Sequence, residues 1–238
     1  MTDTLELVRS LTDAEWNHLA GRLLTGPFPT ARPDQRRPDG DWDVWLVLAG
    51  RGWGKTRTGS EDLVEHARAG GDWFAAGPTY ADARDVMTEG PTGLLGVLRR
   101  RCIAHTWNRS LGELVGEGWR IKVGSADEPE RWRGWNFRGG WADEPGSWRR
   151  LDTWTQIRLA TRLGDHPRIV VTGTPRPTAL VMDLAQRTDG TVHVTRGRML
   201  DNVANLSPAF VAEMERRYAG TRIGRQELDG ELLLDTPG

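Results

Sequence analysis

The chain has 238 residues, enough for one sizeable hydrophobic core, and its 37% hydrophobic and 27% charged content is ordinary for a globular protein. The net charge of −1 gives no overall attraction to nucleic acid, so a DNA contact would need charges segregated on one face. The single cysteine, Cys102, excludes an intrachain disulfide, and no apolar run reaches the roughly 20 residues that span a bilayer, so no membrane contact is expected.

The N-terminal stretch MTDTLELVRS has no basic segment followed by an apolar one, so no signal peptide is predicted and the cytosol is the expected compartment. A helix is predicted over residues 11–24, because Thr12 and Glu15 form a capping-box pattern and apolar residues follow at helical spacing. Residues 25–41 are rich in Pro, Gly and charge, which predicts a surface loop.

From residue 44 onwards, strand patterns alternate with helix patterns. Strands are predicted over residues 44–50, 73–79, 168–175 and 191–195, with a hairpin over 113–125 and a weaker strand over 138–144. Helices are predicted from residue 55, over 80–87, 92–101, 147–164 (with Gly164 as its C-cap) and 179–187, and from residue 207. This alternation predicts one α/β domain over residues 1–238, with a mainly parallel central sheet flanked by helices and residues 1–43 packed on it.

The stretch Ala49-Gly50-Arg51-Gly52-Trp53-Gly54-Lys55-Thr56 keeps the spacing of the phosphate-binding consensus GxxxxGK[ST], although Ala49 replaces its leading glycine. It lies between a predicted strand and a predicted helix, where backbone N–H groups and the helix dipole can hold phosphate. Lys55, one of two lysines in the chain, supplies a compact cation, and the Thr56 hydroxyl can bind Mg²⁺. The flanking elements disfavour a Gly-rich turn with an incidental lysine. Arg51 is either a second cation near the phosphates or a solvent-facing residue.

Two further motifs carry polar groups that phosphate chemistry needs. Asp143 and Glu144 end the predicted strand at 138–144, where one carboxylate can hold Mg²⁺ and the other can orient the attacking water. The strand at 168–175 ends in Thr172-Gly173-Thr174, which places hydroxyls at the edge of the sheet where ligands bind in open α/β folds. Taken alone, the acidic pair would be read as a solvated surface pair, and the threonines equally well as a ligand contact or as an ordinary turn.

Together these motifs resemble the ATPase domain of the large terminase subunit of tailed bacteriophages, the motor that pumps double-stranded DNA into procapsids. The similarity extends over residues 31–234 in the family's order. It is carried by the blocks ARPDQRRPDGDWDVWLVLAGRGWGKTRTG, PTYADARDVMTEGPTGLL, RWRGWNFRGGWADEP, VTGTPRP, DNVANLSPAF and YAGTRIGRQELDGELL. The resemblance implies a P-loop NTPase of the ASCE type, in which a strand is added in the centre of the sheet and a glutamate is catalytic.

The resemblance also implies roles for individual residues. Lys55, Glu144 and Thr174 would be catalytic, with Thr172–Thr174 as the motif that couples the state of the γ-phosphate to movement. Thr56 and Asp143 would hold Mg²⁺. ATP would be bound by the phosphate loop, its flanking residues and an upstream glutamine that reads adenine: Gln35, Gly50, Arg51, Gly52, Trp53, Gly54, Lys55, Thr56 and Arg57.

An arginine finger from a neighbouring subunit is also implied. Arg133, in RWRG before the acidic pair, is the first choice, with Arg131 and Arg138 as alternatives, although each arginine taken singly would be read as a solvated surface residue. The chain is expected to be monomeric alone and to form a homo-oligomeric ring when assembled. Expected partners are double-stranded DNA, the portal protein, the small terminase subunit and a nuclease domain or chain. Its expected place is the host cytoplasm, transiently on the procapsid.

Family members carry a nuclease domain after the ATPase domain, whereas this sequence stops at Gly238, so ATP hydrolysis without DNA cleavage is expected. The basic clusters RRRC, SWRR and MERRYAGTRIGR are either DNA or partner surfaces or solvated helix faces. Three rival functions remain: a helicase-like ATPase, a small-molecule kinase, and a structural subunit that binds nucleotide without turnover.

Overall fold

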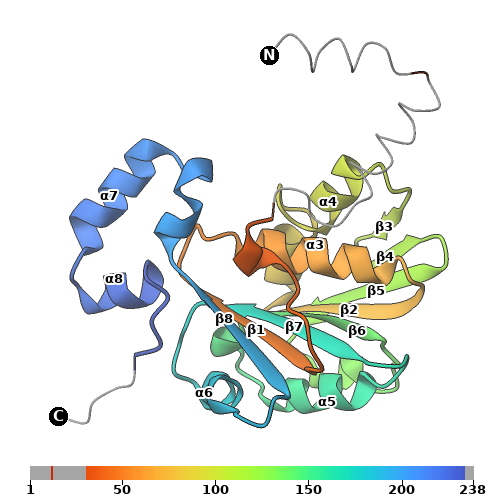
Figure 1. The fold of residues 1–238 in the computed structure, drawn as a ribbon. Helices are drawn as coiled ribbons and strands as arrows, with labels where there is room; N and C mark the ends of the chain where they lie inside the picture. Colours follow the sequence, from red (N-terminus) through yellow and green to blue (C-terminus); the bar gives the residue numbers. More distant parts are fainter. Residues whose placement is uncertain (1–11, 13–30, 234–238) are drawn as a thin grey trace.

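The computed structural model describes Thr12 and residues 31–233, so the helix predicted over residues 11–24 lies almost wholly outside the described residues. One eight-stranded sheet forms the centre, in the order β3-β4-β5-β2-β6-β7-β1-β8 (Figure 1). Six strands are parallel, and β3 and β4 add an antiparallel edge. The strands are β1 (Val44–Ala49), β2 (Gly71–Gly77), β3 (Thr106–Asn108), β4 (Glu113–Gly116), β5 (Trp119–Ser125), β6 (Gly139–Asp143), β7 (Arg168–Gly173) and β8 (Val192–Gly197).

Helices cover both faces of this sheet. In Figure 1, α3 (Lys55–Ala67) and α4 (Leu94–Arg100) lie on one face, and α5 (Asp152–Ala160) and α6 (Ala179–Gln186) lie on the other. Two helices, α7 (Pro208–Tyr218) and α8 (Arg222–Glu227), lie together beyond the β8 edge. Short helical turns complete the described fold: η1 (Pro33–Gln35), η2 (Asp82–Thr88), η3 (Pro129–Trp132), η4 (Pro145–Ser147) and η5 (Met199–Asn205).

The continuous apolar run of β1 reflects burial on both faces, as expected of a central parallel strand. Trp45 and Val47 pack into the core under α3 and α4, whereas Leu46 and Leu48 pack into the core on the α5 and α6 side. Burying each such side chain contributes about 1.5–3 kcal/mol relative to an exposed one. The strand therefore holds the two helix layers to one rigid frame, from which the phosphate loop emerges.

The weakly predicted strand over residues 138–144 is confirmed as β6, in the middle of the sheet. Its glycines are explained by the neighbouring strand: a Cβ on Gly140 would lie 2.3 Å from the ring of Phe74, and a Cβ on Gly139 would lie 2.7 Å from the ring of Trp73. Large aromatic side chains on β2 occupy the space that apolar side chains on β6 would otherwise fill. This central strand is therefore less apolar in sequence than its burial would suggest.

The helix predicted over residues 147–164 is shorter, and Gly164 is not its C-cap. The helix α5 ends at Ala160, and Thr161 is extended. The reason is a competing contact: Phe137 bridges to Thr161, and its carbonyl accepts hydrogen bonds from the N–H groups of Arg162 and Leu163, both at 3.0 Å. Within residues 31–233, the other predicted strands and helices are confirmed with shifted ends, the helix predicted over 80–87 being the π-helical turn η2. The elements β3 and α8 were not predicted.

The strand order contains the additional central strand that is typical of an ASCE-type fold, and this strand is β7. β7 lies between β1, which leads into the phosphate loop, and β6, which ends at Asp143. Because β1, β6 and β7 are parallel, their carboxyl ends meet at one edge of the sheet, where open α/β folds bind ligands. In the part of the chain that is described, no helix combines the length and apolar character needed to cross a membrane.

Candidate functional site

The predicted phosphate loop forms the turn between β1 and α3. Gly52 and Gly54 have φ angles of +76° and +107°, a conformation that favours glycine. Gly50 is required for a different reason, because a Cβ there would lie 2.2 Å from the carbonyl oxygen of Leu228. Ala49, at the consensus position of the leading glycine, is the last residue of β1 and does not have a positive φ. The loop therefore tolerates alanine at that position.

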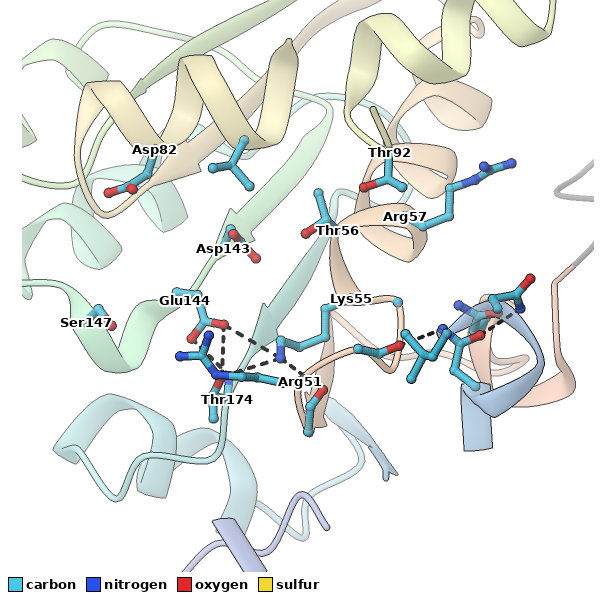
Figure 2. Close-up of a pocket in the computed structure, with 18 of the residues that line it drawn as sticks. Arg51, Lys55, Thr56, Arg57, Asp82, Thr92, Asp143, Glu144, Ser147 and Thr174 are labelled. Carbon is cyan, nitrogen blue, oxygen red and sulfur yellow. Dashed lines mark hydrogen bonds and ion pairs between the residues drawn. The ribbon is translucent and has the colours of Figure 1, made fainter. Parts of the chain in front are cut away.

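Lys55 reaches from the loop to the ends of the neighbouring strands (Figure 2). Its Nζ donates to the carbonyl oxygen of Ala49 at 2.8 Å and to Thr174 Oγ1 at 3.4 Å, and it lies 3.8 Å from Glu144 Oε1. The fold thus brings together the three residues that sequence reasoning predicted to be catalytic within one subunit. The carbonyl contacts hold the ammonium group at the mouth of the loop.

Asp143 is buried at the end of β6. Its Oδ1 accepts a hydrogen bond of 2.5 Å from Thr172 Oγ1, which in turn accepts one of 2.6 Å from Trp141 Nε1. Burial, with a smaller contribution from the charge of Glu144, raises the pKa of Asp143 to about 7. Figure 2 shows the Thr56 hydroxyl on the side of the pocket that faces this carboxylate.

The donor set suits Mg²⁺, which prefers oxygen ligands and is bound in nucleotide sites by one or two protein groups together with phosphate oxygens. Thr56 and Asp143 both line the same pocket and present a hydroxyl and a carboxylate. A buried carboxylate whose ionised form is disfavoured is the group that a cation would stabilise. The residues present therefore fit the cation.

Glu144 has an unusual backbone and a fully engaged carboxylate. Its φ and ψ of 47° and 53° are left-handed, a conformation that costs a non-glycine residue on the order of 1–3 kcal/mol. The Glu144 N–H donates to the Thr172 carbonyl at 2.7 Å, which closes the turn after β6. Thr174 then donates to the carboxylate twice, from its N–H to Oε2 at 3.0 Å and from its Oγ1 to Oε1 at 3.1 Å.

These groups line a cleft of about 860 Å³ at the carboxyl edge of the sheet, large enough for a nucleotide. It is bounded by the phosphate loop, the ends of β6 and β7, and residues of η1, η2 and η5. The lining residues predicted from sequence are Gln35, Gly50, Arg51, Gly52, Gly54, Lys55, Thr56, Arg57, Asp143, Glu144 and Thr174.

Gln35 and Trp53, both predicted to bind nucleotide, form hydrogen bonds within the protein itself. The Gln35 amide donates to Thr58 Oγ1 at 3.1 Å and accepts from the Arg32 N–H at 3.3 Å, which fixes the glutamine against the start of α3. Trp53 is fully buried, with its Nε1 donating to Asp34 at 3.1 Å, and its side chain does not line the cleft. Only the backbone of Trp53 is placed to contribute to the phosphate loop.

The loop arginine Arg51 lies at the cleft and is also exposed, so its role toward phosphate stays a prediction. It lines the cleft, and its exposed side chain pairs with Glu227 of α8 at 3.1 Å. Arg57, in the first turn of α3, pairs with the buried Glu61 at 2.5 Å. Both cations therefore lie at the cleft with carboxylate partners outside it.

None of the three candidate finger arginines lines the cleft of its own subunit. Arg133 is 73% exposed and pairs with Glu130 at 3.2 Å, and Arg131 pairs with Glu128. Arg138 lies at the opposite edge of the sheet, where its backbone N–H donates to Asp72 at the start of β2. Their role toward a neighbouring subunit stays a prediction.

Sequence reasoning missed several residues of the cleft. Asp82, Ser147, Arg176, Asn202 and Asn205 all line it. Four of these five lie within the sequence blocks quoted above, and Ser147 follows the acidic pair by three residues. Their proximity to the motifs could therefore have identified them as candidate site residues. Asn202 is joined to the loop by a 2.6 Å hydrogen bond from its side chain to the Gly52 carbonyl, a contact between segments 150 residues apart.

Several solved structures of similar fold are large terminases of bacteriophages. The Thermus phage P74-26 large terminase ATPase domain aligns with a TM-score of 0.69 and 15% identity, over 89% of this chain and 97% of that domain. The large terminase of a thermophilic bacteriophage, solved in complex with ADP, aligns at 0.68 and 17% over 90% of this chain and 53% of that one. The HK97 bacteriophage large terminase aligns at 0.63 and 15%, over 89% and 55%. At these sequence identities the similarity shows a shared fold. The chain spans about half the length of each of the two longer terminases.

A search among curated proteins finds no match. The family model described as terminase large subunit, T4likevirus-type, N-terminal matches residues 46–238. This range includes the phosphate loop, the acidic pair and the Thr172–Thr174 motif. Since the model matches well over half of the chain, the protein belongs to the terminase large-subunit family and corresponds to the N-terminal part of that subunit.

Proposed function

We propose that this chain hydrolyses ATP and drives the translocation of double-stranded DNA into a procapsid. The observation that carries the proposal is the convergence of Lys55, Glu144 and Thr174 at the mouth of the phosphate loop, with Lys55 Nζ 3.8 Å from Glu144 Oε1. A cation for the phosphates and a carboxylate for the attacking water are the groups that phosphoryl transfer to water requires. A terminase of similar fold has been solved with ADP and with ATP-gamma-S, which supports a nucleotide in this cleft.

The reaction is proposed to depend on Mg²⁺, held by Thr56 and Asp143, which neutralises negative charge on the phosphates. In this scheme the loop N–H groups and Lys55 bind the phosphates, and Glu144 orients water for attack on the terminal phosphorus. Arg133 from a neighbouring subunit is proposed to complete the site. In isolation the chain is then a monomer with weak turnover.

The biological setting follows from the family as a proposal. The assembled motor is a homo-oligomeric ring in the host cytoplasm, transiently on the procapsid. Its partners are the DNA, the portal protein, the small terminase subunit and a nuclease domain or chain. Absence of DNA cleavage by the chain itself also stays a prediction, checked by incubating the protein with plasmid DNA and Mg²⁺.

A phosphate-release assay with the whole chain, ATP and Mg²⁺ separates this proposal from its rivals. We expect slow release that is abolished in Glu144→Gln. A kinase would consume ATP at an appreciable rate only after a small molecule that accepts the phosphate was added. A structural subunit without turnover would bind ATP and release no phosphate. Either result would contradict the proposed hydrolase, and stimulation by single-stranded rather than double-stranded DNA would favour a helicase-like enzyme.

A further inference from the structure

Arg176 stands at the cleft beside the acidic pair. It follows Thr174 by two residues, and its backbone N–H donates to the Thr174 carbonyl at 2.8 Å in a tight turn after β7. Its guanidinium donates from Nη1 to Ser147 Oγ at 3.0 Å, so the side chain crosses from the end of β7 to η4, which begins directly after Glu144. Both Arg176 and Ser147 line the cleft.

The stem of Arg176 is packed against η4. A Cβ on Gly146 would lie 2.9 Å from the Arg176 Cβ, so glycine at that position leaves the space that the arginine stem occupies. Together with the hydrogen bond to Ser147, this packing holds the exposed side chain of Arg176 against η4, the turn that begins directly after Glu144. An arginine held in this way loses less side-chain freedom when it binds an anion than a free surface arginine does.

Among the described residues, no carboxylate pairs with the charge of Arg176. Four cationic side chains line the cleft: Arg51, Lys55, Arg57 and Arg176. The first three lie within 4.0 Å of Glu227, Glu144 and Glu61, respectively. Within residues 31–233, no carboxylate lies within that distance of Arg176, and its side-chain hydrogen bond is to a neutral hydroxyl. Its positive charge is therefore available to a bound anion.

We propose that Arg176 contacts the terminal phosphate of the bound nucleotide from within the same subunit, and that this contact sets a preference for triphosphate over diphosphate. The inference rests on the proposed function, because it takes the γ-phosphate to lie where Lys55, Thr174 and Glu144 meet. A phosphate next to the Glu144 carboxylate is unfavourable unless a further cation offsets the repulsion. The planar guanidinium suits this role because it can bind phosphate oxygens in a bidentate manner.

The test measures the affinities of the whole chain for ADP and for ATP-gamma-S, both with Mg²⁺, at fixed ionic strength and at a concentration where sedimentation shows monomers. Loss of one charge-assisted hydrogen bond predicts that Arg176→Ala weakens ATP-gamma-S binding roughly 10-fold or more and leaves ADP binding within about twofold. Arg176→Lys should show an intermediate loss because it keeps the charge without the fork. Ser147→Ala removes only the tether and should show a smaller loss of ATP-gamma-S affinity.

The matched control is Arg150→Ala, which removes an exposed arginine that pairs with Asp152 at 2.8 Å and does not line the cleft. It should leave both affinities unchanged. If Arg176→Ala weakens ADP and ATP-gamma-S equally, or changes neither, the inference is wrong while the proposed function stands. If the wild-type chain binds neither nucleotide, the proposed function fails first. Unchanged thermal unfolding of nucleotide-free Arg176→Ala shows that the variant is folded.

Discussion

Thr174 engages both oxygens of the Glu144 carboxylate, through its backbone N–H at 3.0 Å and its hydroxyl at 3.1 Å. The same hydroxyl accepts from Lys55 Nζ at 3.4 Å. One threonine, directly after the added central strand β7, therefore joins the cation of the phosphate loop to the carboxylate after β6. This arrangement fixes the direction of a carboxylate whose backbone is in a strained left-handed conformation.

Replacing the Thr174 hydroxyl should show whether it orients the Glu144 carboxylate for catalysis or contributes to nucleotide binding. In Thr174→Val the N–H contact remains and the hydroxyl contact is lost, so kcat should fall about 10- to 100-fold while nucleotide affinity changes by less than about threefold. Thr174→Ser, the matched control, should keep most of the turnover. Steady-state phosphate release and equilibrium nucleotide binding check this, and an equal loss of both quantities in Thr174→Val would show a general disruption of the cleft instead.

Asp143 should limit the stability of the protein when Mg²⁺ and nucleotide are absent. Because burial raises its pKa to about 7, the folded state disfavours the ionised carboxylate. The unfolded chain releases this proton near its ordinary pKa of about 4, so the free energy of unfolding falls as pH rises from about 4 to 7. Asp143→Asn removes the penalty and can still accept the hydrogen bond from Thr172.

In EDTA, Asp143→Asn should therefore unfold at a higher temperature than the wild type at pH 8, by at least about 3 °C, and by less at pH 5. With Mg²⁺ and ATP-gamma-S the order should reverse, because only the wild type gains the metal ligand. Thermal unfolding at the two pH values measures both effects. A variant that is less stable at pH 8 in EDTA would show that the ionised carboxylate is favoured by the fold.

The finger arginine is best tested in assembled motors. Arg133 is exposed, and within residues 31–233 it pairs only with the equally exposed Glu130, so Arg133→Ala should fold and bind nucleotide normally. Its hydrolysis should fail in rings, since a finger supplied from a neighbouring subunit is worth roughly 10³–10⁵ in rate in GTPases. The isolated chain, in which no neighbour is present, should be a poor ATPase for the same reason.

Mixed rings distinguish a finger that acts on the neighbour from one that acts on its own site. Rings containing Arg133→Ala and Glu144→Gln subunits should regain partial activity, because some interfaces combine an intact Glu144 with an intact Arg133. If the mixture stays inactive where rings form, Arg133 is not the finger, and Arg131 and Arg138 are the next to test. Full activity in a demonstrated monomer would remove the need for any neighbouring arginine.

The local parts of the site could be predicted from the sequence, and the long-range parts could not. The phosphate loop follows from the spacing of its glycines and Lys55, because a strand, a tight turn and a helix start are all local events. The role of the acidic pair could not be predicted from its own residues, because Asp143 contacts Thr172 only when β6 and β7 pair in the sheet. Sequence periodicity does not predict that Arg51 pairs with Glu227 or that Arg176 donates to Ser147, because these partners lie on elements distant in the chain.

The wrong end of α5 and the weak strand pattern of β6 have the same origin. Gly164 looks like a helix C-cap, but tertiary contacts of Phe137 end α5 at Ala160 before the helix can reach it. The strand β6 looks weak because Gly139 and Gly140 make room for aromatic rings on its neighbour. In both places packing overrides the local pattern, and only the paired sheet reveals which residue fills the space.

Paired substitutions at Lys55 and Glu144 test the central claim most directly. Lys55→Ala removes the cation at the mouth of the phosphate loop and should weaken ATP-gamma-S binding by at least about 10-fold. Glu144→Gln keeps the shape of the side chain and should leave binding within about twofold while phosphate release falls by at least about 100-fold. The measurement is equilibrium nucleotide binding and phosphate release on the same preparations of both variants and the wild type. Binding that survives in Glu144→Gln with hydrolysis abolished is the predicted result, whereas a Glu144→Gln chain that retains most of its turnover would contradict the assignment of the catalytic carboxylate.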